Sequence, residues 1–204
     1  MARDTDTNLS SSAPDERARA AIRAAFIALA GKHGYRGVRM ADVAERAGMS
    51  RQNLYRYYSN REELYRATLD ELFDRFWLQA EPLFEHFDDS QSERINLMAM
   101  VVAEQHPDIL RLLADPDQHD LSLSLLRRYY ARVLGALARH QGVAQLDRDR
   151  MNMLVAIAAG ASLAGLREWI DSDRRLPANQ MAQIMSHIFN GRLLQVATHF
   201  AEVK

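Results

Sequence analysis

The sequence predicts an all-α protein of about nine helices, and three observations lead to this fold class. Apolar residues recur at intervals of three and four along most of the chain, as they do on one face of a helix. Segments with the alternating apolar and polar pattern of a strand are not apparent. No glycine falls between Met49 and Leu134, which favours helices with tight caps over strands and hairpins.

The N-terminal part of the chain is expected to form a tail followed by the first helix. Residues 1–14 are polar and low in complexity, so we expect a disordered tail. Pro14 in the first turn and Asp15 near the positive end of the dipole then start a helix that runs to about His33. Three glycines break this helix, namely Gly31, Gly34 and Gly37.

Two short helices and a longer one follow. The first starts at Met40, the second is capped by Ser50 and ends at Tyr57, and Asn60 with Glu63 forms a capping-box-like start for the third. This third helix reads through Phe76 and toward Phe87, with a kink expected at Pro82. Further helices are expected near 90–105, 107–115, 119–140, 147–172 and 177–202.

Composition excludes several classes of protein. The 204 residues include no cysteine, so disulfides, thiolate metal sites and cysteine nucleophiles are excluded. The N-terminus has no apolar signal segment, and the longest uncharged stretch, 151–166, has 16 residues. A membrane span needs roughly 18. We expect a cytoplasmic protein that has no membrane partner.

Charge is distributed unevenly along the chain. Residues 17–61 carry ten basic and two acidic side chains, whereas the segments on either side are net acidic. A basic lobe on an acidic body is expected where one end of a protein meets a polyanion. Chance clustering on a solvated face is the alternative explanation.

The segment 40–58 has the pattern of a helix-turn-helix. Two helices of about two turns are joined by a turn that contains Gly48, and the small residues Ala44 and Ala47 allow the helices to touch. Leu54 and Tyr58, four residues apart, are expected to anchor the second helix, and the hydroxyl of Tyr58 should find a partner. The outward residue types suit a major groove. They are Arg51, Gln52, Asn53, Tyr55 and Arg56.

The stretch from Arg17 to Leu72 resembles the N-terminal domain of the TetR (tetracycline repressor) family. The resemblance rests on the Phe26-centred first helix and on short motifs that follow it. These are Gly34-Tyr35-Arg36-Gly37, Asp42-Val43-Ala44, Ala47-Gly48-Met49-Ser50, Leu54-Tyr55 and Asn60-Arg61-Glu62-Glu63-Leu64. The resemblance implies a DNA-binding domain over 15–62 and a ligand-binding and dimerisation domain over 63–204. It also implies a homodimer whose last two helices form an intersubunit four-helix bundle.

Site residues follow from the resemblance position by position. Ser50, Arg51, Gln52 and Asn53 match the groove-facing start of the recognition helix. Tyr55 and Tyr57 match positions that contact phosphate or, in some members, a base. Arg61 matches the usual lysine at the start of the fourth helix, where a phosphate can be held. Arg39 stands where the family commonly has a capping threonine, so a cap is lost and a cation is gained beside the DNA.

An effector pocket is expected in the C-terminal body. Aromatic and methionine side chains suit an adaptable apolar pocket, so we expect a small hydrophobic or aromatic effector. For any one candidate, ordinary core is the favoured alternative. The candidates are Phe73, Trp77, Met98, Val102, Leu126, Tyr130 and Trp169.

The helix over 147–172 is apolar nearly all round and rich in small residues. It is either an interior helix of one subunit or half of a dimer seam shared with the last helix. The seam residues expected on the second interpretation are Ala158, Ala161, Ser162, Gly165, Ile184 and Ile188, with Leu193 and Val196 further along.

Nothing in the sequence predicts catalysis. The His and Glu spacings of zinc and di-iron helices are absent, as are phosphate-binding glycine loops and nucleophile elbows. We therefore expect no catalytic residue, no metal and no cofactor. The leading hypothesis is a repressor that binds a near-palindromic duplex operator and is released by its effector. An architectural DNA-binding protein and an all-α enzyme or carrier with an anionic partner are the rival hypotheses.

Overall fold

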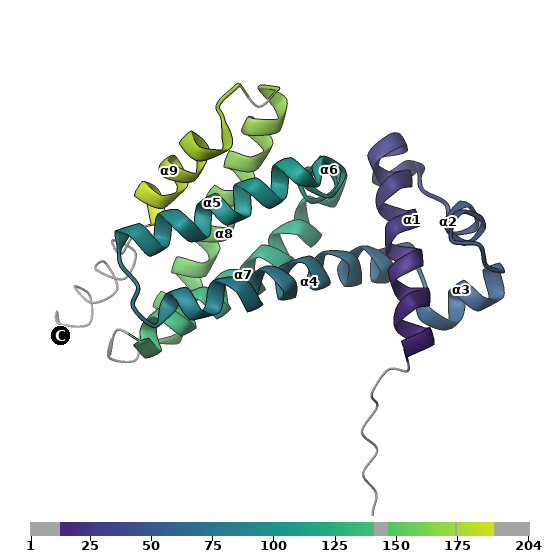
Figure 1. Cartoon of the computed structure of the whole chain (residues 1–204), viewed down its shortest axis with the longest axis horizontal. Coiled ribbons are helices and arrows are strands. Elements are labelled where there is room, and N and C mark those ends of the chain that lie inside the picture. The colour runs from purple at the N-terminus through teal and green to yellow at the C-terminus, as the bar shows by residue number, and fades with distance from the viewer. Residues whose placement is uncertain (1–12, 141–146, 174, 190–204) are drawn as a thin grey trace, which may run out of the picture. The chain divides into compact units, whose positions relative to one another are not determined.

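A computed structural model describes residues 13–140, 147–173 and 175–189 (Figure 1). In these residues the secondary structure consists of nine α-helices and two short 3-10 helices, so the predicted all-α fold is confirmed. The chain forms two compact units, Met1–Leu64 and Tyr65–Lys204, called unit 1 and unit 2 below. The tail expected over 1–14 lies outside the described residues, except for its last two residues, which belong to the first helix.

Unit 1 contains α1 (Ala13–Gly37), α2 (Met40–Arg46), α3 (Arg51–Tyr57) and the first residues of α4 (Arg61–Ala80). Its core is formed by Ile22 and Phe26 of α1, Val43 of α2 and Leu54 of α3, all fully buried. The ring of Phe26 meets that of Tyr35 edge-on at 6.4 Å.

Glycine and polar caps set the helix ends of unit 1. Gly34 has a φ of 69°, so the regular part of α1 ends where the glycines predict a break. At the start of α4 the Glu63 N–H donates to Asn60 Oδ1 (2.8 Å) and the Ser59 N–H donates to Glu63 Oε2 (2.6 Å). The predicted capping-box-like start is therefore present, with Ser59 as the second partner.

Unit 2 is built from the rest of α4 and five further α-helices. They are α5 (Asp89–Gln105), α6 (Pro107–Ala114), α7 (His119–His140), α8 (Arg148–Asp171) and α9 (Ala178–Phe189), with 3-10 helices η1 (Glu81–Phe84) and η2 (Pro116–Gln118). Helix α5 packs along α9, and α7 packs along α8. In place of the kink expected at Pro82, α4 ends at Ala80 and a 3-10 turn begins. The end expected for the last helix, residue 202, lies outside the described residues.

Helix α8 is long and apolar enough to cross a membrane by length and composition alone. Its residues Ala158, Ala159 and Leu163 are fully buried within unit 2. These residues are therefore part of the core of unit 2.

Candidate nucleic-acid interface and effector cavity

The turn between α2 and α3 is held by glycine geometry and backbone hydrogen bonds. Gly48 has a φ of 69°, in the left-handed region that side chains disfavour. The Gly48 N–H donates to Glu45 O (3.0 Å) and the Met49 N–H donates to Ala44 O (3.0 Å), which closes the end of α2. The chain thereby turns between the end of α2 at Arg46 and the start of α3 at Arg51.

Helix α3 is anchored on one side and open on the other. Leu54 and Tyr58 are buried, as predicted, with 0% and 2% of their surface exposed. The Asn53 N–H donates to Ser50 Oγ (3.2 Å), so the Ser50 hydroxyl caps the helix. The opposite side consists of exposed or half-exposed polar side chains. They are Arg51, Gln52, Asn53, Tyr55 and Arg56.

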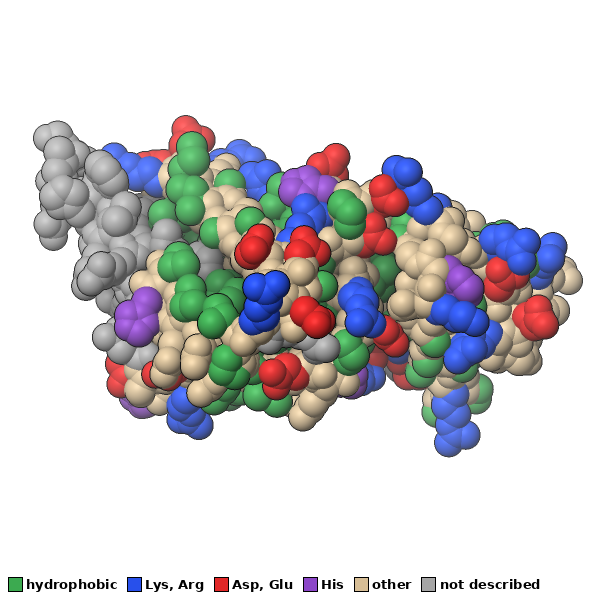
Figure 2. Space-filling view, turned by 90° about the horizontal axis from the view of Figure 1, so that it is seen from above, with side chains coloured by type: hydrophobic (Ala, Val, Ile, Leu, Met, Phe, Trp, Pro, Cys, Tyr) green, Lys and Arg blue, Asp and Glu red, His purple; other side chains and the backbone are tan. Residues whose placement is uncertain are grey.

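Basic side chains gather over unit 1 on the face drawn in Figure 2. Arg39 of unit 1 is paired: its guanidinium donates to both carboxylate oxygens of Asp42, at 2.8 and 2.9 Å. This pair raises the pKa of Arg39 and lowers that of Asp42, mainly through the hydrogen bond. Arg39 gives α2 no side-chain cap, as expected from the missing threonine. The positive charge of Arg39 is partly offset by the carboxylate of Asp42.

Arg61 makes contacts that the resemblance does not predict. Its Nη1 donates to three backbone carbonyls, those of Tyr35 (3.0 Å), Arg36 (2.9 Å) and Val38 (3.0 Å). Its guanidinium also lies 4.2 Å from the centroid of the Tyr35 ring. In this structure the side chain thus closes the C-terminal end of α1, where we expected it to hold a phosphate.

The N-terminal half of α1 holds the C-terminal end of α3 through three polar side chains, which we call the α1 clamp: Asp15, Arg19 and Arg23. The Tyr57 hydroxyl donates to Asp15 Oδ1 (3.0 Å), and Arg23 Nη1 donates to the Tyr58 hydroxyl (3.4 Å). Arg19 lies over both tyrosine rings, at 5.4 and 5.7 Å from their centroids. The predicted partner for Tyr58 is therefore Arg23.

The α1 clamp was not predicted, although its spacing of four residues places all three side chains on one face of α1. The hydrogen bond to Asp15 raises the pKa of Tyr57. Asp15 thus holds the hydroxyl that the resemblance assigns to phosphate.

The α1 clamp gives a first testable prediction. Tyr57→Phe and Asp15→Ala should each lower the free energy of unfolding by about 0.5–1.5 kcal/mol, the usual net value of one hydrogen bond. The double variant should lose little more than either single one, because both remove the same bond. Urea denaturation of the three variants measures this coupling, with Tyr55→Phe as control because Tyr55 is 51% exposed. Additive losses would contradict the clamp.

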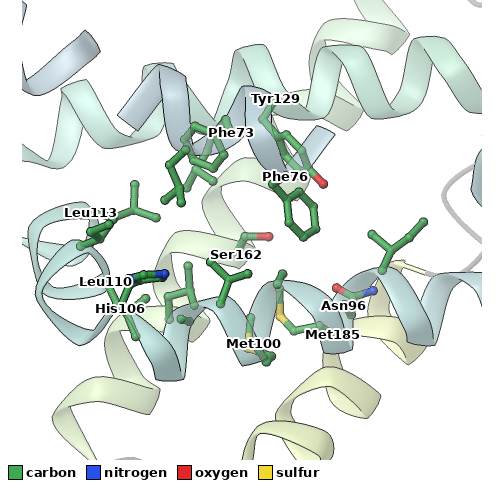
Figure 3. Close-up of a pocket in the computed structure, with 18 of the residues that line it drawn as sticks. Phe73, Phe76, Asn96, Met100, His106, Leu110, Leu113, Tyr129, Ser162 and Met185 are labelled. Atoms are coloured by element: carbon green, nitrogen blue, oxygen red, sulfur yellow. The ribbon is translucent and has the colours of Figure 1, made fainter. Parts of the chain in front are cut away.

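Unit 2 contains an apolar cavity of about 120 Å³ that is partly open to solvent (Figure 3). Side chains of six helices, α4 to α9, line it. Of the seven predicted pocket residues, four lie in the lining: Phe73, Val102, Leu126 and Tyr130. The stacked rings of Phe73 and Tyr129 (5.5 Å) form one wall.

The other three predicted pocket residues do not line this cavity and belong to the core beside it. Trp77 stacks on Phe84 at 5.5 Å, and Met98 packs against the hydrophobic cluster to which both of these rings belong. Trp169 is buried, and its indole N–H donates to Leu176 O (2.7 Å). Their placement matches the alternative of ordinary core.

Two polar side chains meet inside this apolar cavity. The Tyr130 hydroxyl hydrogen bonds to Ser162 Oγ, and either oxygen could be the donor. Burial raises the pKa of Tyr130 to about 12 and raises that of Tyr129 well above its usual value. Both phenols therefore remain protonated near neutral pH.

The residues expected at a dimer seam divide into two groups. Ala158 and Ser162 are buried within unit 2, at 0% and 2% exposure, so this structure does not present them to a partner. Gly165 lies against the side chains of Met181 and Met185. By contrast Ala161, Ile184 and Ile188 are exposed, the two isoleucines at 44% and 53%. Leu193 and Val196 lie outside the described residues.

Helix α8 also exposes Met153 and Ile157, which were not predicted as seam residues. Met153 lies two turns and Ile157 one turn before Ala161, so all three share one face of the helix.

Known proteins share both the N-terminal pattern and the fold. Residues 22–68 match the family described as "Bacterial regulatory proteins, tetR family". The HTH-type transcriptional repressor ComR of Escherichia coli (strain K12) is 42% identical over 45 residues, which are 22% of this chain and 21% of ComR. This match thus spans about a fifth of ComR.

Solved structures extend the similarity over most of the chain. FadR from Bacillus subtilis in complex with stearoyl-CoA has a TM-score of 0.65 and 13% identity, with 83% of this chain and 96% of that one covered. A tetR-family regulator from Streptomyces coelicolor has a TM-score of 0.63 and 18% identity, with 91% and 83% covered. FadR from Thermus thermophilus in complex with lauroyl-CoA has a TM-score of 0.61 and 17% identity, with 86% and 93% covered. Residues 22–68 thus match the tetR family of bacterial regulatory proteins, and the chain as a whole shares the fold of solved tetR-family regulators.

Proposed function

We propose that this protein is a cytoplasmic, effector-responsive repressor that binds a near-palindromic operator as a homodimer. The observation that carries the proposal is the open side of α3, where Arg51, Gln52 and Tyr55 stand exposed on a helix fixed by Leu54. Two such helices in a dimer would enter major grooves about one helical turn apart, roughly 34 Å. The match of residues 22–68 to bacterial regulatory proteins favours this role over an enzymatic one.

Residue chemistry indicates which side chains of α3 would contact bases rather than phosphates. Arg51 and Asn53, at the start of α3, suit bidentate contacts to guanine and adenine. Arg51→Ala should cost about 1–3 kcal/mol on the preferred operator and relax the sequence preference at one position of each half-site. Arg46→Ala is a matched control, because Arg46 is an exposed arginine of α2 rather than of α3.

Selection of bound sequences from random duplex DNA, at physiological salt, tests the proposal. Enrichment of an inverted repeat by the wild-type protein, altered by Arg51→Ala but not by Arg46→Ala, is the expected result. Binding without enrichment would favour the architectural DNA-binding alternative, since phosphate contacts alone carry no sequence information. Failure to bind any duplex, with or without effector, would contradict both the operator-binding proposal and the architectural alternative.

Exposed apolar side chains support the homodimer. Met153 and Ile157 of α8 are 63% and 53% exposed, and Ile184 and Ile188 of α9 repeat the same four-residue spacing. Such rows are expected where a second subunit covers them. The residues lie on the two helices that the family resemblance assigns to the intersubunit bundle.

Ile157→Asp and Ile188→Asp test this dimer surface. Each should convert the dimer to monomer at micromolar concentration, because a buried, unpaired carboxylate is costly. Leu78→Asp is the control, since Leu78 of α4 is 72% exposed and lies on neither helix. Sedimentation equilibrium measures the association. A dimer that survives both α8 and α9 variants would place the interface elsewhere.

An apolar cavity supports a hydrophobic effector. Two FadR proteins that share this fold were determined with acyl-CoA ligands, which agrees with an apolar effector site in the same kind of body. Release from DNA requires the effector to bind the DNA-incompetent conformation more tightly than the competent one. Helix α4 carries Arg61 near its start and the cavity residues Phe73 and Phe76 further along, so one continuous helix is available to transmit the change.

A further inference from the structure

The lining of the cavity carries no full charge that could neutralise a ligand. Among the described residues that line it, none is lysine, arginine, aspartate or glutamate. Polar lining groups are Asn96, His106, Ser162 and the two tyrosines, and His106 is exposed at the junction of α5 and α6. A charged group moved from water into such surroundings loses its hydration and gains no ionic partner. The cavity should therefore discriminate against ligands that are charged where they enter it.

The Tyr130–Ser162 pair places two hydroxyl groups side by side in the apolar lining. Ser162 comes from α8 and lies between the walls formed by the α4 and α5 side chains (Figure 3). Each hydroxyl can both donate and accept, so the pair can rearrange to receive one further donor or acceptor. Asn96, by comparison, already donates from its amide to Ser92 O (2.9 Å).

The volume of the cavity matches a group of about the size of one ring. An apolar cavity of about 150 Å³ lined by leucine, isoleucine and phenylalanine side chains is known to hold one benzene molecule. The present cavity, at about 120 Å³, is close to that size and is lined by the same kinds of side chain.

We propose that the cavity binds an uncharged, ring-sized molecule whose single hydroxyl or carbonyl group hydrogen bonds to Tyr130 and Ser162. The inference rests on the proposed function, since this molecule, or the part of it that enters unit 2, would be the effector. It narrows the effector from hydrophobic compounds in general to neutral compounds with one polar end.

Four probes with the same ring separate charge from hydrogen bonding: toluene, benzyl alcohol, benzoate and benzylammonium. Binding to the full-length protein near pH 7 is measured by titration calorimetry and by the shift of the thermal unfolding midpoint. Toluene and benzyl alcohol should bind, and the two ions should bind at least about tenfold more weakly, as expected for an unpaired charge in an apolar site. An ion that binds as tightly as benzyl alcohol would overturn the proposal, as would failure of both neutral probes to bind.

Tyr130→Phe tests the polar end. It should weaken benzyl alcohol by about three- to tenfold, the usual range for one hydrogen bond, and leave toluene within about twofold. Tyr65→Phe is the matched control: its hydroxyl makes an equivalent buried hydrogen bond to Ser122 Oγ (2.6 Å), and neither residue lines the cavity. Equal weakening of toluene and benzyl alcohol by Tyr130→Phe would mean that the pair only supports the wall.

The DNA selection described above, performed without probes, keeps the two proposals apart. If the protein selects an operator sequence but binds neither toluene nor benzyl alcohol, the effector inference is wrong and the proposed operator-binding function still stands. A protein that binds benzyl alcohol in the predicted way but selects no DNA sequence overturns the operator-binding role alone.

Discussion

Arg61→Ala should lower the free energy of unfolding by about 2–3 kcal/mol, because a charged donor to three carbonyls is lost together with its contact to an aromatic ring. The carbonyls of Tyr35, Arg36 and Val38 would lose their shared partner, and the end of α1 would loosen. Arg61→Lys should recover only part of the loss, since an ammonium on a flexible stem lacks the planar guanidinium fork. Urea denaturation measures both, with the exposed Arg46→Ala as control.

Salt dependence of DNA binding separates this structural role from a phosphate contact. A phosphate-binding arginine contributes about one unit to the slope of log K against log salt concentration. Arg61→Ala should leave that slope nearly unchanged, because the guanidinium is engaged within unit 1. If the slope falls by about one while stability is retained, the family's phosphate role holds for Arg61 and the carbonyl contacts are secondary.

Leu54→Ala should be at least as damaging, with a loss of about 2–5 kcal/mol, the range measured for leucine truncation in packed cores. Leu54 is fully buried and is the one buried side chain of α3. Its truncation therefore weakens the packing of α3 against the rest of unit 1, and the proposed operator binding should be lost as a consequence. Denaturation and DNA binding are measured on the same preparation.

Two neighbours of Leu54 serve as opposite controls. Gln52→Ala should leave stability within about 0.5 kcal/mol, as is usual for an exposed site. Tyr55→Ala should keep stability and weaken DNA binding, since its side chain is 51% exposed on the open side of α3. A stable Leu54→Ala variant that still selects the operator would contradict the anchoring role.

Helix positions were largely predictable because the stop signals in this sequence are local. Pro107 starts α6, Pro177 directly precedes α9, and Gly34 interrupts α1 through its own backbone conformation. These effects depend on one residue and its neighbours, so periodicity and caps were enough. The 3-10 turn after Ala80 was less accessible, since Pro82 is compatible with a kink or a stop.

Side-chain partners were harder to predict, because distant segments decide them. Phe73 and Trp77 lie one turn apart on the same face of α4, yet only Phe73 lines the cavity, because Phe84 covers Trp77. Arg61 shows the same difficulty: a cation at a helix start can meet a phosphate or the carbonyls of another helix end, and the sequence does not distinguish them.

Helix α8 illustrates a limit of periodicity itself. Small and apolar residues lie on all sides of this helix, so no polar stripe in its sequence identifies the side that faces away from the core. Ala158 is buried and Ala161 is exposed, although their chemistry is identical.

Because α3 has exposed side chains and the sequence has no cysteine, the distance between the two α3 helices of the proposed dimer can be measured with labels attached to introduced cysteines. A Gln52→Cys substitution would introduce a single thiol at an exposed site into each subunit. Spin labels on the two thiols of a dimer would report the distribution of their separations, which could be compared before and after benzyl alcohol is added. If the distribution of label separations broadens or shifts when the ligand is added, the dimer exists in at least two conformations, and the effector acts by changing their populations.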